Sequence, residues 1–524
     1  MLKKVLFPLF CWALFTASLN ADSPFESAQS AYSDTPINRV LLAHWKKQSL
    51  TPPAMASDAV FLRRLALTAT GRLPSVAEVQ RFAKDKRLDK RAIWIDQMLA
   101  SPEYADMQAM RFADMLRIKS EFPINLWPNA VQAYHWQIRA DLLRDRPLNE
   151  LFRQMLTISG SNFREPYANF FRASADRSPE GLAKMVLLTT CGMRENSMKP
   201  EELAAFSLLF SRIRYKSTYE WKEEIVFNAI EPVELHVRLP DGTLSKVNSG
   251  RIDPRQVFAD WLFGDGVEYF ERAMTNRAWH WCFGRGIYPV ADDLPLLHAL
   301  PSAAEAGNVP FSTELQKLLN EEFRKGGYSL RHLYRIIMNS ALFQASSLDQ
   351  SEKRLANGAT YPMHSLEAEL LIDALAQVTK EYDKYSSVIP EPFTFLPHNS
   401  RAVTIADGSI TSGVLDNFGR PPRDSGLLSE RKTASTDSQE IYLMNSAVLY
   451  RRIQTYCRSL QKSLRNDERR LERVYMEILS RLPTDEERQE FLKYQKSLDA
   501  KSQSRALLDT VWILFNSKEF VFHH

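Results

Sequence analysis

The chain of 524 residues is several times longer than a usual domain of roughly 100–200 residues, so two or three domains are expected. Its 44% hydrophobic, 11% aromatic and 25% charged residues are those of an ordinary globular protein and exclude a largely disordered, collagen-like or multi-span membrane protein. Its 67 basic against 63 acidic residues give no reason to expect a nucleic-acid partner, and its 18 glycines are too few for the many tight turns of an all-β fold.

The chain begins with the pattern of a secretory signal peptide. Lys3 and Lys4 precede an uncharged run over residues 5–19, and the small residue Ala21 stands where signal peptidase would cleave. This run is shorter than the ~20 residues that a bilayer span needs, and no later apolar stretch reaches that length. We therefore expect residues 1–21 to be removed, leaving an exported protein without a transmembrane span, either periplasmic or extracellular at the cell surface. An uncleaved anchor is the alternative.

Residues 35–215 are predicted to form a first helical domain. Apolar residues recur at helical spacing from Asp58 onward, with Ser75 placed to cap a helix and Glu78 three residues later. Over residues 216–252 the pattern changes to alternating apolar and polar residues around the turn signal Pro-Asp-Gly-Thr. This alternation predicts a small β-hairpin insert or linker.

Residues 253–524 are predicted to form a second helical domain, so the expected fold class is mainly α. Helical periodicity covers residues 254–281, 313–323, 330–343, 365–378, 439–457, 467–479, 485–496 and 505–515. Residues 385–438 are instead rich in Pro, Ser, Gly and Asn without a sustained period. This loop is far longer than the ~15 residues beyond which structureless loops are uncommon, so it is expected to be functional or disordered.

A helix-Pro-helix pattern occurs near both ends of the chain, because residues 62–82 align with residues 471–491 without gaps. The identical positions are Leu62/Leu471, Arg64/Arg473, Arg72/Arg481, Leu73/Leu482, Pro74/Pro483, Glu78/Glu487, Gln80/Gln489 and Phe82/Phe491. Each copy has the pattern of a helix, an Arg-Leu-Pro break and a second helix. A repeat of this kind indicates a duplicated packing unit and not a duplicated active site.

Two sets of motifs in the chain resemble a pair of secreted-protein families found in planctomycetes and verrucomicrobia. Residues 61–74, 99–104 and 111–117 resemble domain-of-unknown-function family 1549, and residues 260–262, 270–279, 283–286, 327–333 and 418–421 resemble family 1553. The resemblance implies an exported, mainly helical protein linked to c-type cytochrome modules and to other secreted proteins of polysaccharide-degrading bacteria. It carries over no catalytic residue, because neither family has an established activity.

The chain departs from these families at the position of a haem motif. Many members carry a C-x-x-C-H haem-attachment motif where this chain has Cys191 followed by Gly-Met-Arg-Glu-Asn, with no second cysteine and no histidine. The other cysteines after the leader, Cys282 and Cys457, are distant in the sequence, so their spacing indicates no zinc ribbon, redox pair or disulfide framework. We therefore expect no cofactor and no metal.

The densest polar and aromatic cluster of the chain lies between residues 276 and 293. Its members are Asn276, Arg277, Trp279, His280, Trp281, Arg285, Asp292 and Asp293. Guanidinium groups donate paired hydrogen bonds to carboxylate or sulfate, and an indole face suits a sugar ring, so the cluster is a candidate site for an anionic saccharide. The alternative is that the arginines pair with Asp292 or Asp293 inside the protein while the tryptophans fill the core.

The long loop holds a second candidate site. Gly419 and the rigid pair Pro421 and Pro422 could present Arg420 and Arg423 to a cleft. The alternative is that this segment is a packed connector.

The sequence contains no H-E-x-x-H, G-x-S-x-G, P-loop or G-x-G-x-x-G motif. We therefore expect an exported, non-catalytic binding or assembly module of the cell envelope, with secreted or envelope proteins or anionic polysaccharide as partners. One alternative is a polysaccharide-acting enzyme of the hydrolase type, whose carboxylate pair the sequence does not single out. A second alternative is an electron-transfer partner of a c-type cytochrome, which would have to hold haem non-covalently.

Overall fold

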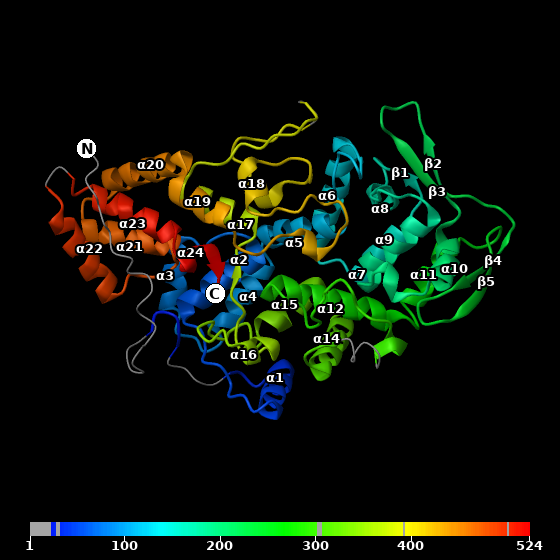
Figure 1. Cartoon of the computed structure of the whole chain (residues 1–524), viewed down its shortest axis with the longest axis horizontal. Helices are drawn as coiled ribbons and strands as arrows, with labels where there is room; N and C mark the ends of the chain where they lie inside the picture. The colour runs from blue at the N-terminus through cyan, green and yellow to red at the C-terminus, as the bar shows by residue number, and fades with distance from the viewer. Residues whose placement is uncertain (1–22, 28–31, 301–306, 391–393, 500–501) are drawn as a thin grey trace.

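The computed structural model describes residues 23–27, 32–300, 307–390, 394–499 and 502–524. In this part of the chain helices dominate and the strands form only small antiparallel sheets (Figure 1), which confirms the mainly α fold. The signal peptide predicted at residues 1–21 lies outside the described residues. None of the described helices is long and apolar enough to cross a membrane.

The first half of the chain is helical and its helices begin at conventional caps. The helices are α1 (Pro36–Lys47), α2 (Asp58–Thr70), α3 (Val76–Lys84), α4 (Lys90–Leu99), α5 (Pro102–Met115), α6 (Pro128–Leu143), α7 (Leu148–Thr157), α8 (Asn169–Arg172), α9 (Pro179–Cys191) and α10 (Pro200–Ser207). The side chains of Ser57, Ser75, Ser101 and Ser178 accept backbone N–H groups at the starts of α2, α3, α5 and α9. Such caps satisfy N–H groups that have no partner within the helix.

The predicted β insert contains two hairpins, where one was expected. Strands β2 (Ile213–Ser217) and β3 (Glu224–Asn228) pair with each other, and β3 also pairs with β1 (Gly160–Ser161) from the preceding helical region. Strands β4 (Glu234–Arg238) and β5 (Leu244–Asn248) form the second hairpin. Both hairpins lie at one end of the molecule (Figure 1).

The remaining helices follow in chain order and continue to the end of the chain. They are α11 (Pro254–Leu262), α12 (Val267–Phe283), α14 (Thr313–Lys325), α15 (Leu330–Met338), α16 (Glu352–Ala356), α17 (Ala368–Thr379), α18 (Gly413–Asn417), α19 (Asp437–Asn445), α20 (Ala447–Ser463), α21 (Asp467–Ile478), α22 (Asp485–Ser497), α23 (Arg505–Phe515) and α24 (Lys518–Val521). The short strands β6 (His364–Ser365) and β7 (Phe522–His523) pair with each other. Single 3-10 turns occur at Pro166–Ala168, Glu195–Ser197, Leu208–Phe210, Leu297–Ala299, Ala402–Thr404 and Leu428–Glu430.

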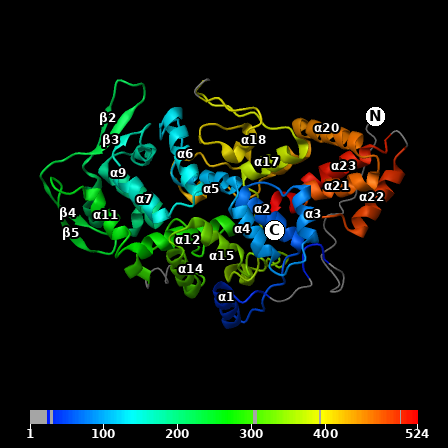
Figure 2. The same ribbon diagram turned by 180° about the vertical axis from the view of Figure 1, so that it is seen from behind.

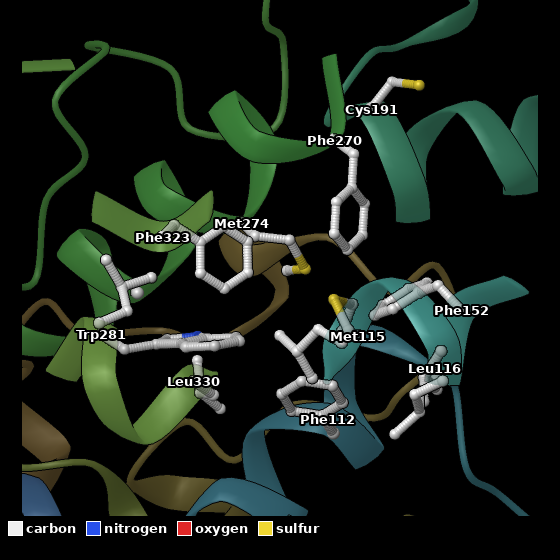
Figure 3. Packing of buried hydrophobic residues seen from close by; sticks show 14 of the residues in the cluster. Phe112, Met115, Leu116, Phe152, Cys191, Phe270, Met274, Trp281, Phe323 and Leu330 are labelled. Atoms are coloured by element: carbon white, nitrogen blue, oxygen red, sulfur yellow. The ribbon is translucent and has the colours of Figure 1, made fainter. Parts of the chain in front are cut away.

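The hydrophobic cores follow a different division from the predicted domains. One large cluster joins α1–α10 to α11, α12, α14 and α15, and Figure 3 shows aromatic and methionine side chains of α5, α7 and α12 gathered in it. A second cluster joins α17 and α20–α24 to Leu67 and Leu73, which lie in and just after α2. Helices α20–α23 of this second cluster lie at the opposite end of the molecule from the hairpins (Figure 2). Helix α2 therefore contributes to both cores.

From residue 401 onward, the long segment between α17 and α19 is packed against the helices, although it has no sustained period, whereas Val388 and Phe395 in its first part are exposed. Apart from residues 391–393, which are outside the described residues, it contains α18 and buried residues such as Val403, Ile405 and Leu415. Its Ala402 and Val403 N–H groups donate to the carboxylate of Asp373 in α17 at 2.6 and 3.2 Å. Polar contacts of this kind fix a chain path that hydrophobic periodicity does not encode.

The two helix-Pro-helix segments have the same local interactions. In each, an arginine before the break pairs with a glutamate in the first turn of the next helix, and the residue before that helix forms a capping box with the same glutamate. The residues are Arg72, Ser75 and Glu78 before and within α3, and Arg481, Thr484 and Glu487 before and within α22. Helix α3 also contacts α21, so parts of the two segments are neighbours in space.

Arg64 of α2 binds the C-terminal end of the chain from inside the protein. Its Nε donates to the oxygen of His524 at 2.8 Å, and its Nη1 donates to the carbonyls of Phe343 and Ala345, the latter at 2.9 Å. Its guanidinium also lies 3.6 Å from the centroid of the Tyr361 ring. One fully buried side chain thus joins α2, the segment after α15 and the residue that follows β7.

The pairing of β6 with β7 places two buried histidines against each other. His364 is opposite His523, and their rings stack with centroids 4.7 Å apart. Burial lowers the pKa of His364 to about 4 and the pKa of His523 well below its ordinary value. Both rings are therefore neutral near neutral pH.

The Arg64→Met variant is expected to lower the free energy of unfolding by about 3–5 kcal/mol, because it leaves three carbonyl oxygens without their donor. Urea unfolding of the purified protein measures the change. The Arg39→Met variant is the control, since Arg39 forms an exposed ion pair with Asp34. A loss as small in Arg64→Met as in the control would contradict the assigned role.

The His364→Phe variant is expected to make stability less dependent on pH. His364 has a folded pKa of about 4 against 6.5 for the ordinary side chain, so the unfolded chain binds more protons between these values and stability falls as pH drops from 6.5 towards 4. Between pH 7 and pH 4 the wild type should lose about 3 kcal/mol more than His364→Phe, measured by urea unfolding at each pH. His236→Phe, at an exposed position of β4, should keep the wild-type slope.

Candidate functional site

Arg277, the central arginine of the predicted cluster, is engaged inside the protein. It is 1% exposed, and its Nη1 and Nη2 donate to the carbonyls of Thr189 and Leu188, the former at 2.6 Å. Its Nε lies 3.8 Å from Oδ1 of Asp292. Two of its three nitrogen atoms therefore bind the C-terminal turn of α9.

Asn276 and Trp279 of the same helix are also buried. The Asn276 side chain accepts the N–H groups of Ile287 and Tyr288 at 2.8 and 3.2 Å and donates to the carbonyl of Ala291. It therefore fixes the loop that follows α12. The indole of Trp279 lies 4.4 Å from the ring centroid of Phe283, within the large core.

Arg420 and Arg423 of the long loop point into the protein as well. Arg420 donates to the carbonyl of Asp407 at 3.2 Å and lies 3.3 Å from Glu369 of α17. Arg423 donates to Asp114 of α5 at 2.8 Å and to the carbonyl of Ala406 at 2.7 Å. These contacts are those of a packed connector between α5 and α17.

Four other members of the predicted cluster line a cavity of about 290 Å³, which we name the α5–α12 cavity; Asp293 is not among its lining residues. It lies between α5, the end of α12, the loop at 284–292, the residue before α17 and the segment 421–433. His280, Trp281, Arg285 and Asp292 line it, and so do Arg111 and Glu367. Some of the predicted site residues are therefore buried in contacts within the protein, and others line this cavity.

Several buried polar atoms of the cavity wall make no hydrogen bond with the described residues. They are Nε and Nη1 of Arg111, Oε2 of Glu367, Nδ1 of His280 and Oδ1 of Asp292. Buried polar groups are nearly always hydrogen-bonded, because an unpaired one costs about 1–3 kcal/mol. These five atoms belong to residues that line one cavity, which we take as the candidate site; other unpaired buried atoms are spread over the rest of the described residues.

Arg111 and Glu367 form one wall of the cavity. Arg111 is 3% exposed, its Nη2 lies 3.5 Å from Oε1 of Glu367, and its guanidinium lies 5.7 Å from the ring centroid of Trp281. Although burial opposes it, the carboxylate of Glu367 raises the pKa of Arg111, which therefore keeps its charge.

Two further groups of the cavity have pKa values shifted by burial. Burial and the nearby charge of Arg111 lower the pKa of His280 to about 3, so this ring is neutral. Burial raises the pKa of Asp292 above its ordinary value, against the opposite influence of Arg277. The cavity therefore offers neutral as well as charged groups to a ligand.

The segment 421–433 is held in place as the outer wall of the cavity. The guanidinium of Arg431 donates to Asp114 at 2.6 Å and to Glu369 at 2.5 Å. The N–H of Leu428 donates to Oδ2 of Asp292 at 2.5 Å. The loop after α12 is thus joined directly to this segment.

The sequence analysis did not select Arg111, Glu367 or Arg431. They stand in α5, before α17 and in the long loop, and no spacing rule joins positions so far apart in the chain. The only signal was that Arg111 begins one of the motifs that resemble family 1549.

The described part of the chain contains neither a cluster of metal-binding side chains nor an exposed thiol. No group of three His, Cys, Asp or Glu residues there is placed to hold a metal ion. Cys191, Cys282 and Cys457 are buried free thiols, and burial raises the pKa of Cys191 to about 11.

Comparison with known families gives two matches that together cover most of the chain. Residues 36–186 match the family model PSCyt2, a protein of unknown function (DUF1549), and residues 254–495 match PSD1, a protein of unknown function (DUF1553). No curated protein and no solved structure matches the chain. The chain therefore carries a DUF1549 domain followed by a DUF1553 domain, the pair of families that its motifs resemble.

Proposed function

We propose that this protein is an exported binding or assembly module of the cell envelope and that it holds its ligand in the α5–α12 cavity. The observation that carries the proposal is the set of buried, unpaired polar atoms on the cavity wall. A ligand that supplies their hydrogen bonds gains free energy that water-exposed groups could not provide.

Anionic polysaccharide is the partner that the cavity chemistry favours. Arginine side chains from α5, the loop after α12 and the segment 421–433 surround the cavity, and Trp281 adds an aromatic wall. Arginine binds carboxylate and sulfate through paired donors, and aromatic rings suit the faces of sugars. A secreted or envelope protein that presents an acidic group is the other partner of this class.

One observation favours the hydrolase alternative as a second candidate. Asp292 and Glu367 both line the cavity, and the raised pKa of Asp292 is the property of a general acid. The release of reducing ends from a polysaccharide, abolished in Asp292→Asn, would favour hydrolysis over binding alone.

We also propose that residues 62–82 and 471–491 are copies of one packing unit. The matching Arg-Glu pairs and capping boxes of the two segments support this. On this proposal the two copies stabilise the two hydrophobic cores and take no part in ligand binding.

The Arg285→Glu variant is expected to weaken retention of an acidic polysaccharide at least about tenfold, since it reverses a charge at the cavity. Arg285 is exposed and donates one hydrogen bond, to the carbonyl of Leu355. The melting temperature of the Arg285→Glu variant should therefore stay near that of the wild type. Affinity electrophoresis of the mature chain through gels containing acidic or neutral polysaccharide measures retention.

Lys317→Glu is the matched control, because Lys317 is an exposed residue of α14 that does not line the cavity. It should bind as the wild type does. Equal retention of Arg285→Glu and wild type would contradict a role of the cavity in polysaccharide binding.

A further inference from the structure

The guanidinium of Arg111 is the least satisfied charged group of the cavity wall. An arginine has five N–H donors, yet Nε and Nη1 of Arg111 are buried and make no hydrogen bond with the described residues. The nearest carboxylate oxygen, on Glu367, is 3.5 Å from Nη2, beyond a good charged hydrogen bond. A buried cation in this state calls for an anionic acceptor.

Other unpaired groups of the cavity wall lack hydrogen-bond donors instead of acceptors. Oε2 of Glu367 and Oδ1 of Asp292 are acceptors without donors. The neutral ring of His280 adds an unpaired Nδ1, which donates or accepts according to its tautomer. A ligand that is only an anion would leave these acceptors unpaired, whereas hydroxyl groups donate to carboxylates and also accept.

The charge balance of the wall limits the charge of the ligand. Four arginines line the cavity against three acidic side chains: Arg111, Arg194, Arg285 and Arg431, and Asp114, Asp292 and Glu367. With all seven groups ionised, this leaves one positive charge in excess, which suits a group of charge −1. A phosphate monoester, with a charge of about −1.5 to −2, would face repulsion from the carboxylates.

The size of the cavity limits the ligand further. A volume of about 290 Å³ is at the lower end of small-molecule sites, which are about 300–1,000 Å³. Such a space takes one sugar ring and not an extended stretch of polymer.

We propose that the α5–α12 cavity binds a single hydroxylated sugar acid, such as a uronic acid at the end of a polysaccharide chain. Arg111 binds the carboxylate, while Glu367, His280 and Asp292 bind hydroxyl groups. This inference rests on the proposed function and names the ligand class of that site.

Calorimetric titration of the full mature chain tests the ligand class. The probes are glucuronate, galacturonate, glucose, galactose, glucose 6-sulfate and acetate. A uronate should bind at least about tenfold more tightly than the neutral sugar of the same configuration and than acetate. Equal binding of the neutral sugar, or tighter binding of the sulfate ester, would overturn the proposal.

The Arg111→Gln and Glu367→Gln variants test the assigned roles. Arg111→Gln should lose at least about tenfold in affinity for the uronate while its weak affinity for the neutral sugar changes little. Glu367→Gln should weaken both sugars. Arg335→Gln is the control, because Arg335 forms an exposed ion pair with Asp96 away from the cavity. Unchanged uronate affinity in Arg111→Gln would contradict the assignment.

Hydrogen exchange of the wild type provides a readout that does not depend on the folding of Arg111→Gln. Uronate should slow amide exchange in 421–433, the outer wall of the cavity, and neutral sugar at the same concentration should not. Protection confined to other segments would overturn the site. If acidic polysaccharide is retained through Arg285 but no uronate binds, the ligand class is wrong and the proposed function stands; if neither binds, both fail.

Discussion

Buried guanidinium groups that donate to backbone carbonyls hold distant parts of this chain together. Arg63 and Arg64 lie side by side in α2, and between them they bind the carbonyls that end α21, α24 and β7 and the turn after α15. Arg277 does the same between α12 and α9. A buried charge is tolerated only when such partners replace water, so each of these arginines requires the whole surrounding arrangement to be formed.

This constraint explains a fold that has little sheet and much irregular chain. The carbonyls at helix ends have no partner within the helix, and the arginines supply donors to several of them. The same principle holds the segment 421–433, where Arg423 and Arg431 bind Asp114 of α5. Segments without a hydrophobic period therefore take a defined path.

Some buried guanidinium nitrogens have no hydrogen-bond partner among the described residues. They include atoms of Arg63, Arg64 and Arg272, and two nitrogens of Arg111 at the α5–α12 cavity. Arg111 is as deeply buried as Arg277, but its Nε and Nη1 have no partner among the described residues. Arg277 serves the fold through its carbonyl partners, whereas the unpaired nitrogens of Arg111, which lines the cavity, are the basis of the proposed binding role. An unpaired donor inside a protein is costly, so its place at a cavity, next to unpaired acceptors, supports a binding function.

Hydrophobic periodicity and cap residues determined the helices in advance, because both act within a few residues. Ser75 and Glu78 formed the predicted capping box at the start of α3. The same local patterns missed the second hairpin and the packed path of residues 401–431, which depends on polar and apolar contacts with residues distant in the sequence. The hydrophobic clusters likewise joined α11 and α12 to the first half of the chain, which no local pattern indicates.

Residue types by themselves determined which chemistry the site could have, since arginine, histidine and tryptophan at 277–285 indicated an anionic ligand. Only the tertiary structure decided which of them are available. Arg277 donates its hydrogen bonds to carbonyls of α9 and is not available to a ligand. Arg111 and Glu367, which are 256 positions apart in the sequence, line the same cavity. The physical reason is that hydrogen-bond partners and burial depend on segments brought together by folding, and no rule of sequence spacing reaches across such distances.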